Sequence, residues 1–130
     1  MAGRYDVNQL LTDARSRIVR YSPTQLQQAL AEGILVIDTR SQADRQREGT
    51  IPGSIPVPLS VLLWRLDPEA EATNPRLNDL HEAKVIVCAD GYSSSWAAAT
   101  LADLGFSAIG DLDGGFHAWA AEGLPVVAAD

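Results

Sequence analysis

Short runs of apolar residues alternate along this chain with segments in which apolar side chains recur every three or four positions. Two runs, residues 34–37 and 84–88, are almost wholly apolar, which is typical of strands covered on both faces of a parallel sheet. Shorter strands are predicted at residues 18–21 and 106–112. The prolines around residues 54–57 restrict a further strand to a sheet edge, because proline cannot donate to a central ladder.

Helices are predicted between these strands. Ser22 and Pro23 read as an N-cap and a first helical residue, and Gly33 ends the helix that they begin. Ser94 is available as the N-cap of a later helix. The predicted helices cover residues 7–17, 23–32, 41–48, 59–66, 94–104 and 116–122, and residues 69–78 are predicted to form a polar surface loop.

The helix predicted at residues 116–122 has a distinct apolar face. Phe116, Trp119 and Ala120 are expected to point inward as core residues. His117 lies on the opposite face and is expected to be exposed and inert. No second histidine, cysteine or carboxylate cluster stands at metal-ligand spacing, so we predict no metal site.

Strands and helices alternate from one end of the chain to the other. This order predicts an α/β fold with a mostly parallel central sheet of about five strands and helices on both faces. The 130 residues are enough for one domain with an ordinary core. We find no internal repeat, linker or low-complexity segment.

Charge and composition exclude several classes of function. The chain has 10 lysines and arginines against 17 acidic residues, and its net charge of -7 disfavours the phosphate backbone of nucleic acids as a partner. No apolar run reaches membrane-spanning length, and the first residues lack the apolar region of a secretory signal. A single cysteine cannot form an intramolecular disulfide. We therefore expect a cytoplasmic protein without nucleic-acid or membrane partners.

The single cysteine, Cys88, lies where a predicted strand ends and a loop leads into a helix. Backbone N–H groups and the positive dipole end at a helix start stabilise an anion placed before them, here the thiolate. An ordinary thiol has a pKa of about 8.5. Lowering that pKa by one unit corresponds to roughly 1.4 kcal/mol of stabilisation of the thiolate relative to the thiol. Cys88 is thus a candidate nucleophile, although a lone cysteine after an apolar strand is more often a small buried hydrophobe.

Polar residues also follow the strand predicted at residues 34–37. Asp38 and Arg40 stand at its carboxyl end, the edge at which open α/β sheets bind ligands. The structural alternative is that Asp38 is a capping carboxylate and that Arg40 pairs with a nearby acid such as Asp44. We favour this alternative for both and keep them as supporting residues only.

Four short motifs follow one another along the chain. They are Ile37-Asp38-Thr39-Arg40, Gly49-Thr50-Ile51-Pro52-Gly53-Ser54, Cys88-x-x-Gly91-x-Ser93-Ser94 and Leu112-Asp113-Gly114-Gly115-Phe116-x-x-Trp119. In this order they resemble the motifs of the single-domain rhodanese family, over about residues 18 to 127. Each motif is weak alone, but four in the right order and spacing are strong evidence. The resemblance implies a rhodanese-like domain at 18–127 preceded by a helical extension at 1–17.

The resemblance implies a sulfurtransferase with a covalent, two-step reaction and no cofactor. In such enzymes the cysteine thiolate takes the outer sulfur of thiosulfate or a persulfide, and a thiol or cyanide accepts that sulfur from the resulting persulfide. A protein donor or acceptor is a further expectation. The implied catalytic residue is Cys88, and the implied loop that binds substrate and sulfur consists of Ala89, Asp90, Gly91, Tyr92, Ser93 and Ser94.

Two positions depart from the usual pattern of this family. Ser93 stands where many members carry an arginine, and Asp90 adds a negative charge nearby. We therefore predict weak affinity for thiosulfate and a preference for a less anionic or protein-bound donor. Thr50 replaces a histidine of the second motif, which we interpret as structurally tolerable.

Three alternatives to the sulfurtransferase stay open. A phosphatase or arsenate reductase of the related dual-specificity type needs an arginine where Ser94 stands, and usually a histidine before Cys88. A non-catalytic rhodanese-like binding module generally lacks the cysteine that is present here. A redox sensor would need an external thiol, because this chain has no second cysteine.

Overall fold

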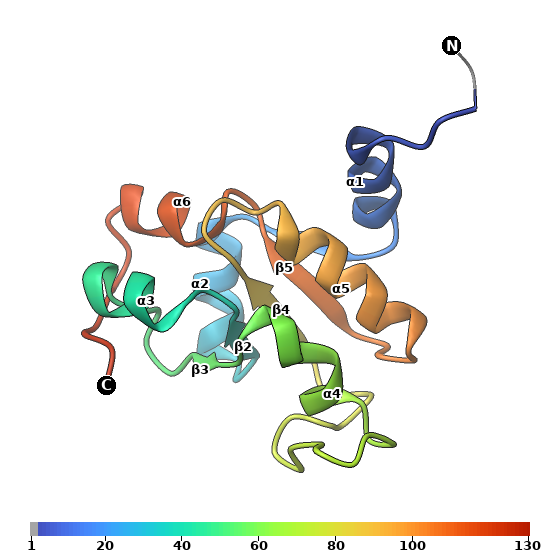
Figure 1. Cartoon of the computed structure of the whole chain (residues 1–130). Coiled ribbons are helices and arrows are strands. Elements are labelled where there is room, and N and C mark those ends of the chain that lie inside the picture. The colour runs from blue at the N-terminus through green and yellow to red at the C-terminus, as the bar shows by residue number, and fades with distance from the viewer. Residues whose placement is uncertain (1–2) are drawn as a thin grey trace.

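The computed structural model describes residues 3–130, which form one five-stranded sheet with helices on both faces (Figure 1). Every neighbouring pair of strands is parallel, in the order β1-β5-β4-β2-β3, so the five carboxyl ends meet at one edge. The strands are β1 (Val19–Tyr21), β2 (Leu35–Asp38), β3 (Ile55–Pro56), β4 (Lys84–Val87) and β5 (Ile109–Leu112). The predicted α/β fold is confirmed.

The helices begin where capping residues permit. The side chains of Asp6 and Ser22 accept from the backbone N–H groups of Gln9 and Gln25, whose side chains bond back to the caps. Pro23 is the first helical residue of α2, as predicted. The helices are α1 (Val7–Ser16), α2 (Pro23–Ala31), α3 (Gln42–Glu48), the 3-10 helix η1 (Leu59–Val61), α4 (Leu62–Leu66), α5 (Ser93–Asp103) and α6 (Gly115–Ala121).

Two details of the predicted helices are wrong. Helix α5 has Tyr92 at its cap position and no side-chain cap, because the Ser94 hydroxyl is used inside the fold instead. On α6, Phe116 and Trp119 are buried as predicted, but Ala120 is exposed, since it lies one position beyond the face that meets the sheet.

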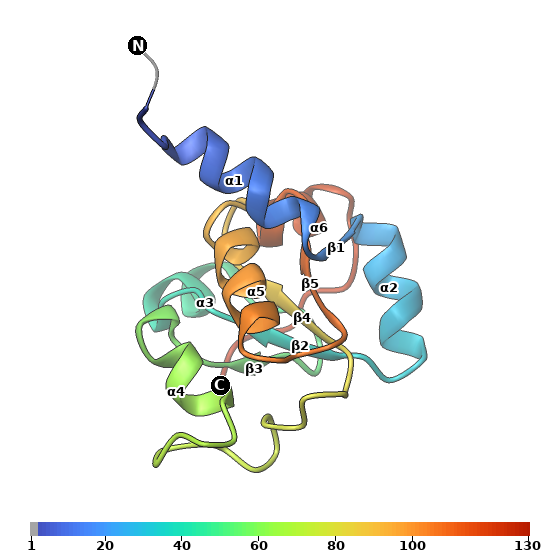
Figure 2. The same ribbon diagram turned by 90° about the vertical axis from the view of Figure 1, so that its right-hand side faces the viewer.

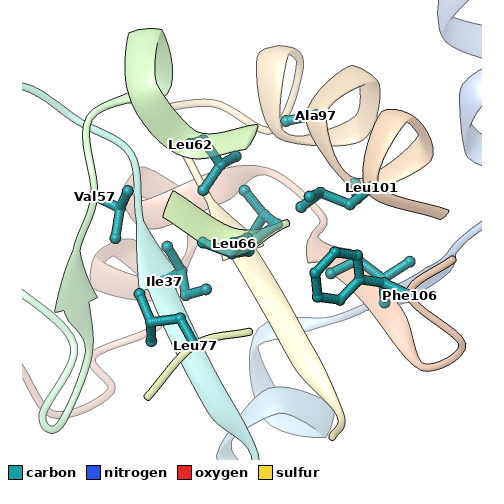
Figure 3. Packing of buried hydrophobic residues seen from close by; sticks show 11 residues of the cluster. Ile37, Val57, Leu62, Leu66, Leu77, Ala97, Leu101 and Phe106 are labelled. Atoms are coloured by element: carbon teal, nitrogen blue, oxygen red, sulfur yellow. The ribbon is translucent and has the colours of Figure 1, made fainter. Parts of the chain in front are cut away.

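One apolar cluster fills the face of the sheet that α4 and α5 cover (Figure 3). Leu66 of α4 and Leu101 of α5 are fully buried there. Leu77 is also fully buried although it belongs to the segment predicted as a polar surface loop, which it pins to the core. The cluster contains Ile37, Val57, Leu62, Leu66, Leu77, Ile86, Ala97, Ala98, Leu101, Phe106 and Ile109.

A second cluster fills the opposite face, under α2 and α6 (Figure 1). The side chains of β4 alternate between the two clusters, because successive residues of a strand point to opposite faces. This explains why the strand reads as a continuous apolar run. The second cluster contains Leu26, Val36, Ile51, Val85, Val87, Leu112, Phe116 and Trp119.

Helix α1 packs along α5 (Figure 2). Its only fully buried residue is Ala14. The guanidinium of Arg17 binds the Asp103 carboxylate and the Ala99 carbonyl, which fixes the end of α1 to α5. None of the helices in residues 3–130 has both the length and the apolar character needed to span a bilayer.

Candidate active site

The loop between β4 and α5 lies at the carboxyl edge of the sheet and holds Cys88 at its base. The chain turns there from a central strand into a helix within a few residues. Cys88 is only 7% exposed, yet its sulfur is not packed among apolar side chains alone. The position of this thiol therefore fits a recessed nucleophile with polar neighbours.

Polar groups of the loop contact the Cys88 sulfur. The Gly91 N–H donates to Sγ over 3.1 Å, and Sγ and the Ser94 hydroxyl are 3.2 Å apart. Burial acts to raise the pKa of Cys88, but hydrogen bonds from the Ser94 and Ser93 hydroxyls and from the N–H groups of Ser94 and Gly91 outweigh it. The net result is a lowered pKa, which favours the thiolate.

Behind the sulfur, Ser94 connects Cys88 to a buried carboxylate. The Ser94 hydroxyl donates to Asp111 Oδ2 over 2.8 Å, and the Ser95 hydroxyl donates to the same oxygen over 2.7 Å. Arg20 of β1 pairs with Asp111 at 2.9 Å, which compensates the buried charge. Asp111 therefore orients the two serines that begin α5.

The loop carbonyl of Gly91 is held on the outside of the loop. Arg15 Nη2 donates to it over 2.8 Å and Arg20 Nη2 over 3.1 Å, while the Ser95 hydroxyl, whose one proton is donated to Asp111, lies 3.2 Å away. In a trans peptide the C=O and the following N–H point in opposite directions. The Tyr92 N–H consequently points away from the arginines.

The other side of the loop rests on the start of α6. The Phe116 N–H donates to the Cys88 carbonyl over 2.8 Å, and the His117 N–H donates to the Ala89 carbonyl over 3.0 Å. Gly115 is at the closest approach: a Cβ there would lie 2.5 Å from the Ala89 carbonyl oxygen, and its φ of +64° also disfavours other residues. The glycine thus lets the backbone at the start of α6 approach the backbone of Cys88 and Ala89.

His117 joins the loop to the rest of the protein, so the expectation that it is inert is wrong. Its Nδ1 lies 2.8 Å from the Asp90 carboxylate and its Nε2 lies 2.9 Å from Glu48. Hydrogen bonds with Asp90 and then Glu48 raise its pKa, which favours the imidazolium. The negative charge of Asp90 is therefore compensated, although the His117 ring is exposed as predicted.

Asp38 and Arg40 are both buried and pair with each other, with Arg40 Nη2 2.8 Å from Asp38 Oδ2. Arg40 thus pairs with nearby acids as predicted, but Asp44 is not one of them, because it binds Arg47 on α3. Arg40 also lies 3.7 Å above the Phe116 ring. Within residues 3–130, neither residue has a hydrogen bond to the Cys88 loop. Arg40 instead binds Glu48 at 3.2 Å, and Glu48 in turn contacts His117, which binds Asp90 of the loop.

Of the six predicted loop residues, Gly91 and Ser94 place a hydrogen-bonding atom within 3.2 Å of the Cys88 sulfur. Asp90 and the Tyr92 side chain face outward, and Tyr92 is 64% exposed. Sequence reasoning missed Arg15, Arg20 and Asp111. Asp111 had one signal, a charged residue inside an apolar strand, whereas the two arginines had none. Residues 3–130 hold no group of three or more His, Cys, Asp or Glu side chains suited to a metal ion.

Comparison with known proteins gives consistent matches along most of the chain. The model of the family described as Rhodanese-like domain matches residues 22–122. A sulfurtransferase of Allochromatium vinosum is 34% identical over 107 residues, covering 81% of this chain and 91% of that protein. The thiosulfate sulfurtransferase GlpE of Pseudomonas entomophila is 36% identical over 104 residues, covering 80% of this chain and 86% of that protein.

Solved structures show the same fold. A protein of unknown function from Rhodopseudomonas palustris, described as a possible tyrosine phosphatase, superposes with a TM-score of 0.87 at 27% identity, covering 98% of each chain. A thiosulfate sulfurtransferase of Pseudomonas aeruginosa superposes with a TM-score of 0.69 at 29% identity, over 86% of this chain and 20% of that one. The first likeness reaches beyond residues 22–122 and includes α1.

Proposed function

This chain belongs to the rhodanese-like domain family, and from that premise we propose that it is a sulfurtransferase whose catalytic residue is Cys88. The observation that supports this most is the set of hydrogen-bond donors around the Cys88 sulfur, which lowers the pKa of the thiol. A thiolate held in this way is a nucleophile near neutral pH. The same donors suit the negative charge of a persulfide.

The proposed reaction has two displacement steps. The Cys88 thiolate attacks the outer sulfur of a donor such as thiosulfate or an organic persulfide; the donor's S–S bond breaks, and the remainder of the donor leaves with the electron pair. An acceptor thiolate or cyanide then attacks the outer sulfur of the Cys88 persulfide and releases the Cys88 thiolate. The residues of the loop supply donors at both stages.

Mass spectrometry of the intact protein tests this proposal. After exposure to thiosulfate or to polysulfide, we expect the chain to gain one sulfur atom, and cyanide should remove that atom as thiocyanate. The variant Cys88→Ser should gain no sulfur. If the wild-type thiol stays unmodified with both donors, or if Cys88→Ser is modified equally, the proposed function is wrong and a binding module becomes the better description.

A phosphatase is a second candidate because of the solved structure from Rhodopseudomonas palustris that is described as a possible tyrosine phosphatase. Against it, Ser94 stands where the related phosphatases carry an arginine, and the nearby Arg15 and Arg20 bind a carbonyl on the outside of the loop. We expect no hydrolysis of para-nitrophenyl phosphate above the level of Cys88→Ser. Cys88-dependent hydrolysis would favour the phosphatase.

A further inference from the structure

A hollow of about 500 Å³ opens beside the Cys88 loop, between α1 and the first turns of α5. Its volume is within the range of small-molecule sites. None of the described residues that line it is charged. The lining residues are Val7, Asn8, Leu10, Leu11, Tyr92, Ser93 and Trp96.

The walls of this hollow expose large apolar side chains to solvent. Val7 is 70% exposed, Tyr92 64% and Trp96 43%, so the two most exposed large hydrophobic residues of the described part of the chain and a third exposed one gather at one place. Clustered exposure of this kind marks binding sites more often than scattered exposure does. The core of the fold gives no reason for it, because these side chains lie outside both buried clusters.

The α1 wall of the hollow is held in place by two arginines at the C-terminal end of α1. Arg15 Nε donates to the Ser95 hydroxyl over 3.0 Å, and its guanidinium lies 5.7 Å from the centre of the Tyr92 ring. Arg17, the residue that follows α1, binds Asp103 of α5. The wall formed by α1 is therefore held against the loop.

Ser93 connects the hollow to the Cys88 loop. It lines the hollow and is the chain neighbour of Ser94, whose hydroxyl lies 3.2 Å from the Cys88 sulfur. Trp96 lies one helical turn further along the same face of α5. A molecule in the hollow would thus extend from the Trp96 ring to the loop that holds Cys88.

We propose that this hollow binds the organic group of a small, uncharged, apolar thiol that accepts sulfur from the Cys88 persulfide. The inference rests on the proposed function and names its acceptor class. In this step the acceptor thiolate R–S⁻ attacks the outer sulfur of Cys88–S–SH; the S–S bond breaks, Cys88 leaves as the thiolate, and the acceptor leaves as the perthiol R–S–SH. The net charge of -7 and the uncharged lining both disfavour an anionic R group.

Binding is tested without any sulfur transfer, using benzyl methyl sulfide, a thioether that cannot react. The chain has three tryptophans, whose indole N–H groups give separate NMR signals. Trp96 lines the hollow, Trp64 is 59% exposed in a different hollow on α4, and the buried Trp119 indole donates to Pro125. We expect the Trp96 signal alone to move on titration. If Trp64 moves equally, or if no signal moves, the proposed subsite is wrong.

Discharge of the preformed persulfide tests the role of the hollow in the reaction. The acceptors are benzyl mercaptan, the anionic 2-mercaptoethanesulfonate, and cyanide, which has no organic group. We expect Trp96→Ser and Val7→Asp to raise the KM for benzyl mercaptan about tenfold relative to that for cyanide, the effect typical of a lost apolar contact. Val7 is the first residue of α1, where an aspartate is compatible with the helix dipole.

The matched control is Trp64→Ser, which removes an exposed tryptophan from the other hollow. It should change the KM neither for benzyl mercaptan nor for cyanide. Equal losses with benzyl mercaptan and cyanide, or a preference of the wild type for the anionic thiol, would overturn the subsite. If Cys88 accepts no sulfur but the Trp96 signal moves with the thioether, the proposed function fails and the binding site stands. If sulfur transfer works and Trp96 does not respond, only the subsite fails.

Discussion

Ser94 has one hydroxyl proton and two acceptors that compete for it. The hydroxyl donates to Asp111 and lies 3.2 Å from the Cys88 sulfur, which acts as the donor while it carries its own proton. When Cys88 ionises, Ser94 can turn its proton to the thiolate, because Ser95 and Arg20 continue to satisfy Asp111. This exchange allows the buried site to hold either the thiol or the thiolate without an unpaired group.

Replacing Ser94 by alanine removes this donor from the thiolate. Because a hydrogen bond to a charged group contributes about 1.5–3 kcal/mol, we expect the rate of Cys88 alkylation by iodoacetamide at neutral pH to fall by roughly tenfold or more. The inflection of the rate against pH should move upward, as the pKa of Cys88 rises. Thr100→Ala, on the same helix but bonded only to the Trp96 carbonyl, is the control. An unchanged pH profile in Ser94→Ala would contradict this role.

Ser93 is the second hydroxyl near the sulfur and stands where many relatives carry an arginine. Ser93→Arg adds a cation at the mouth of the loop, and we expect the KM for thiosulfate to fall by about threefold to tenfold, since a charge-assisted bond to an anion is gained. The same variant should not improve a neutral persulfide donor. Steady-state kinetics with thiosulfate and with the neutral persulfide measures both KM values. An unchanged KM for thiosulfate would show that the missing arginine at position 93 does not cause the weak affinity that we expect.

His117 makes stability depend on pH through its bonds to Asp90 and Glu48. Its pKa is raised in the folded state, so the stabilisation is complete below the unfolded value of about 6.5 and is lost as the pH rises through the folded pKa. Cys88 acts in the opposite direction, because its lowered pKa adds stability as the pH rises.

In a Cys88→Ser background, we therefore expect the urea midpoint to decline above about pH 6.5. The decline corresponds to less than about 1 kcal/mol, because exposed ion pairs are screened by solvent. His117→Gln should make this part of the profile flat. The same decline in His117→Gln would show that another group is responsible.

At the scale of elements, the loop depends on its two neighbours more than on its own sequence. Helix α6 binds the first two carbonyls of the loop, and α1 with β1 binds the carbonyl of Gly91. Each contact fixes the direction of a C=O group of the loop. The N–H group that follows it then points in the opposite direction. The loop is therefore shaped by elements that lie far from it in the chain.

Arg15 is the contribution of α1 to this arrangement. We expect Arg15→Met to slow sulfur uptake by Cys88 about fivefold or more, because the Gly91 carbonyl loses a charged donor worth at least about 1 kcal/mol. Faster hydrogen exchange at the Tyr92 amide should accompany the change. Arg47→Met, which breaks an exposed ion pair on α3, serves as the control. Normal uptake in Arg15→Met would mean that β1 alone holds the loop.

The strands and most helices could be predicted because their signals are local. An apolar run, a proline after Ser22 or a glycine after a helix each acts within a few residues. The contacts of Arg15 and His117 could not be predicted, since they join residues that are 76 and 27 positions apart. The local sequence predicts Ser94 as a helix cap, but its hydroxyl binds Asp111, which lies on β5 and is distant in the chain.

For the molecule as a whole, the two apolar clusters hold the sheet edge, and hence the site, in place. Leu101 and Leu104 belong to the same helix, but Leu101 is fully buried and Leu104 is 40% exposed. We expect Leu101→Ala to lower the free energy of unfolding by about 2–5 kcal/mol through a cavity in the first cluster. Leu104→Ala should cost less than about 1 kcal/mol. Urea unfolding measures both, and equal costs would contradict the packing described.

The recessed position of Cys88 affects what the protein meets in each state of the proposed cycle. A bare thiol that is 7% exposed is shielded from bulky oxidants and from accidental mixed disulfides. A second sulfur bonded to it lengthens the side chain by about 2 Å. The proposed persulfide would therefore reach beyond the shielded position of the thiol, so that a partner could meet the sulfur being transferred without meeting the bare cysteine.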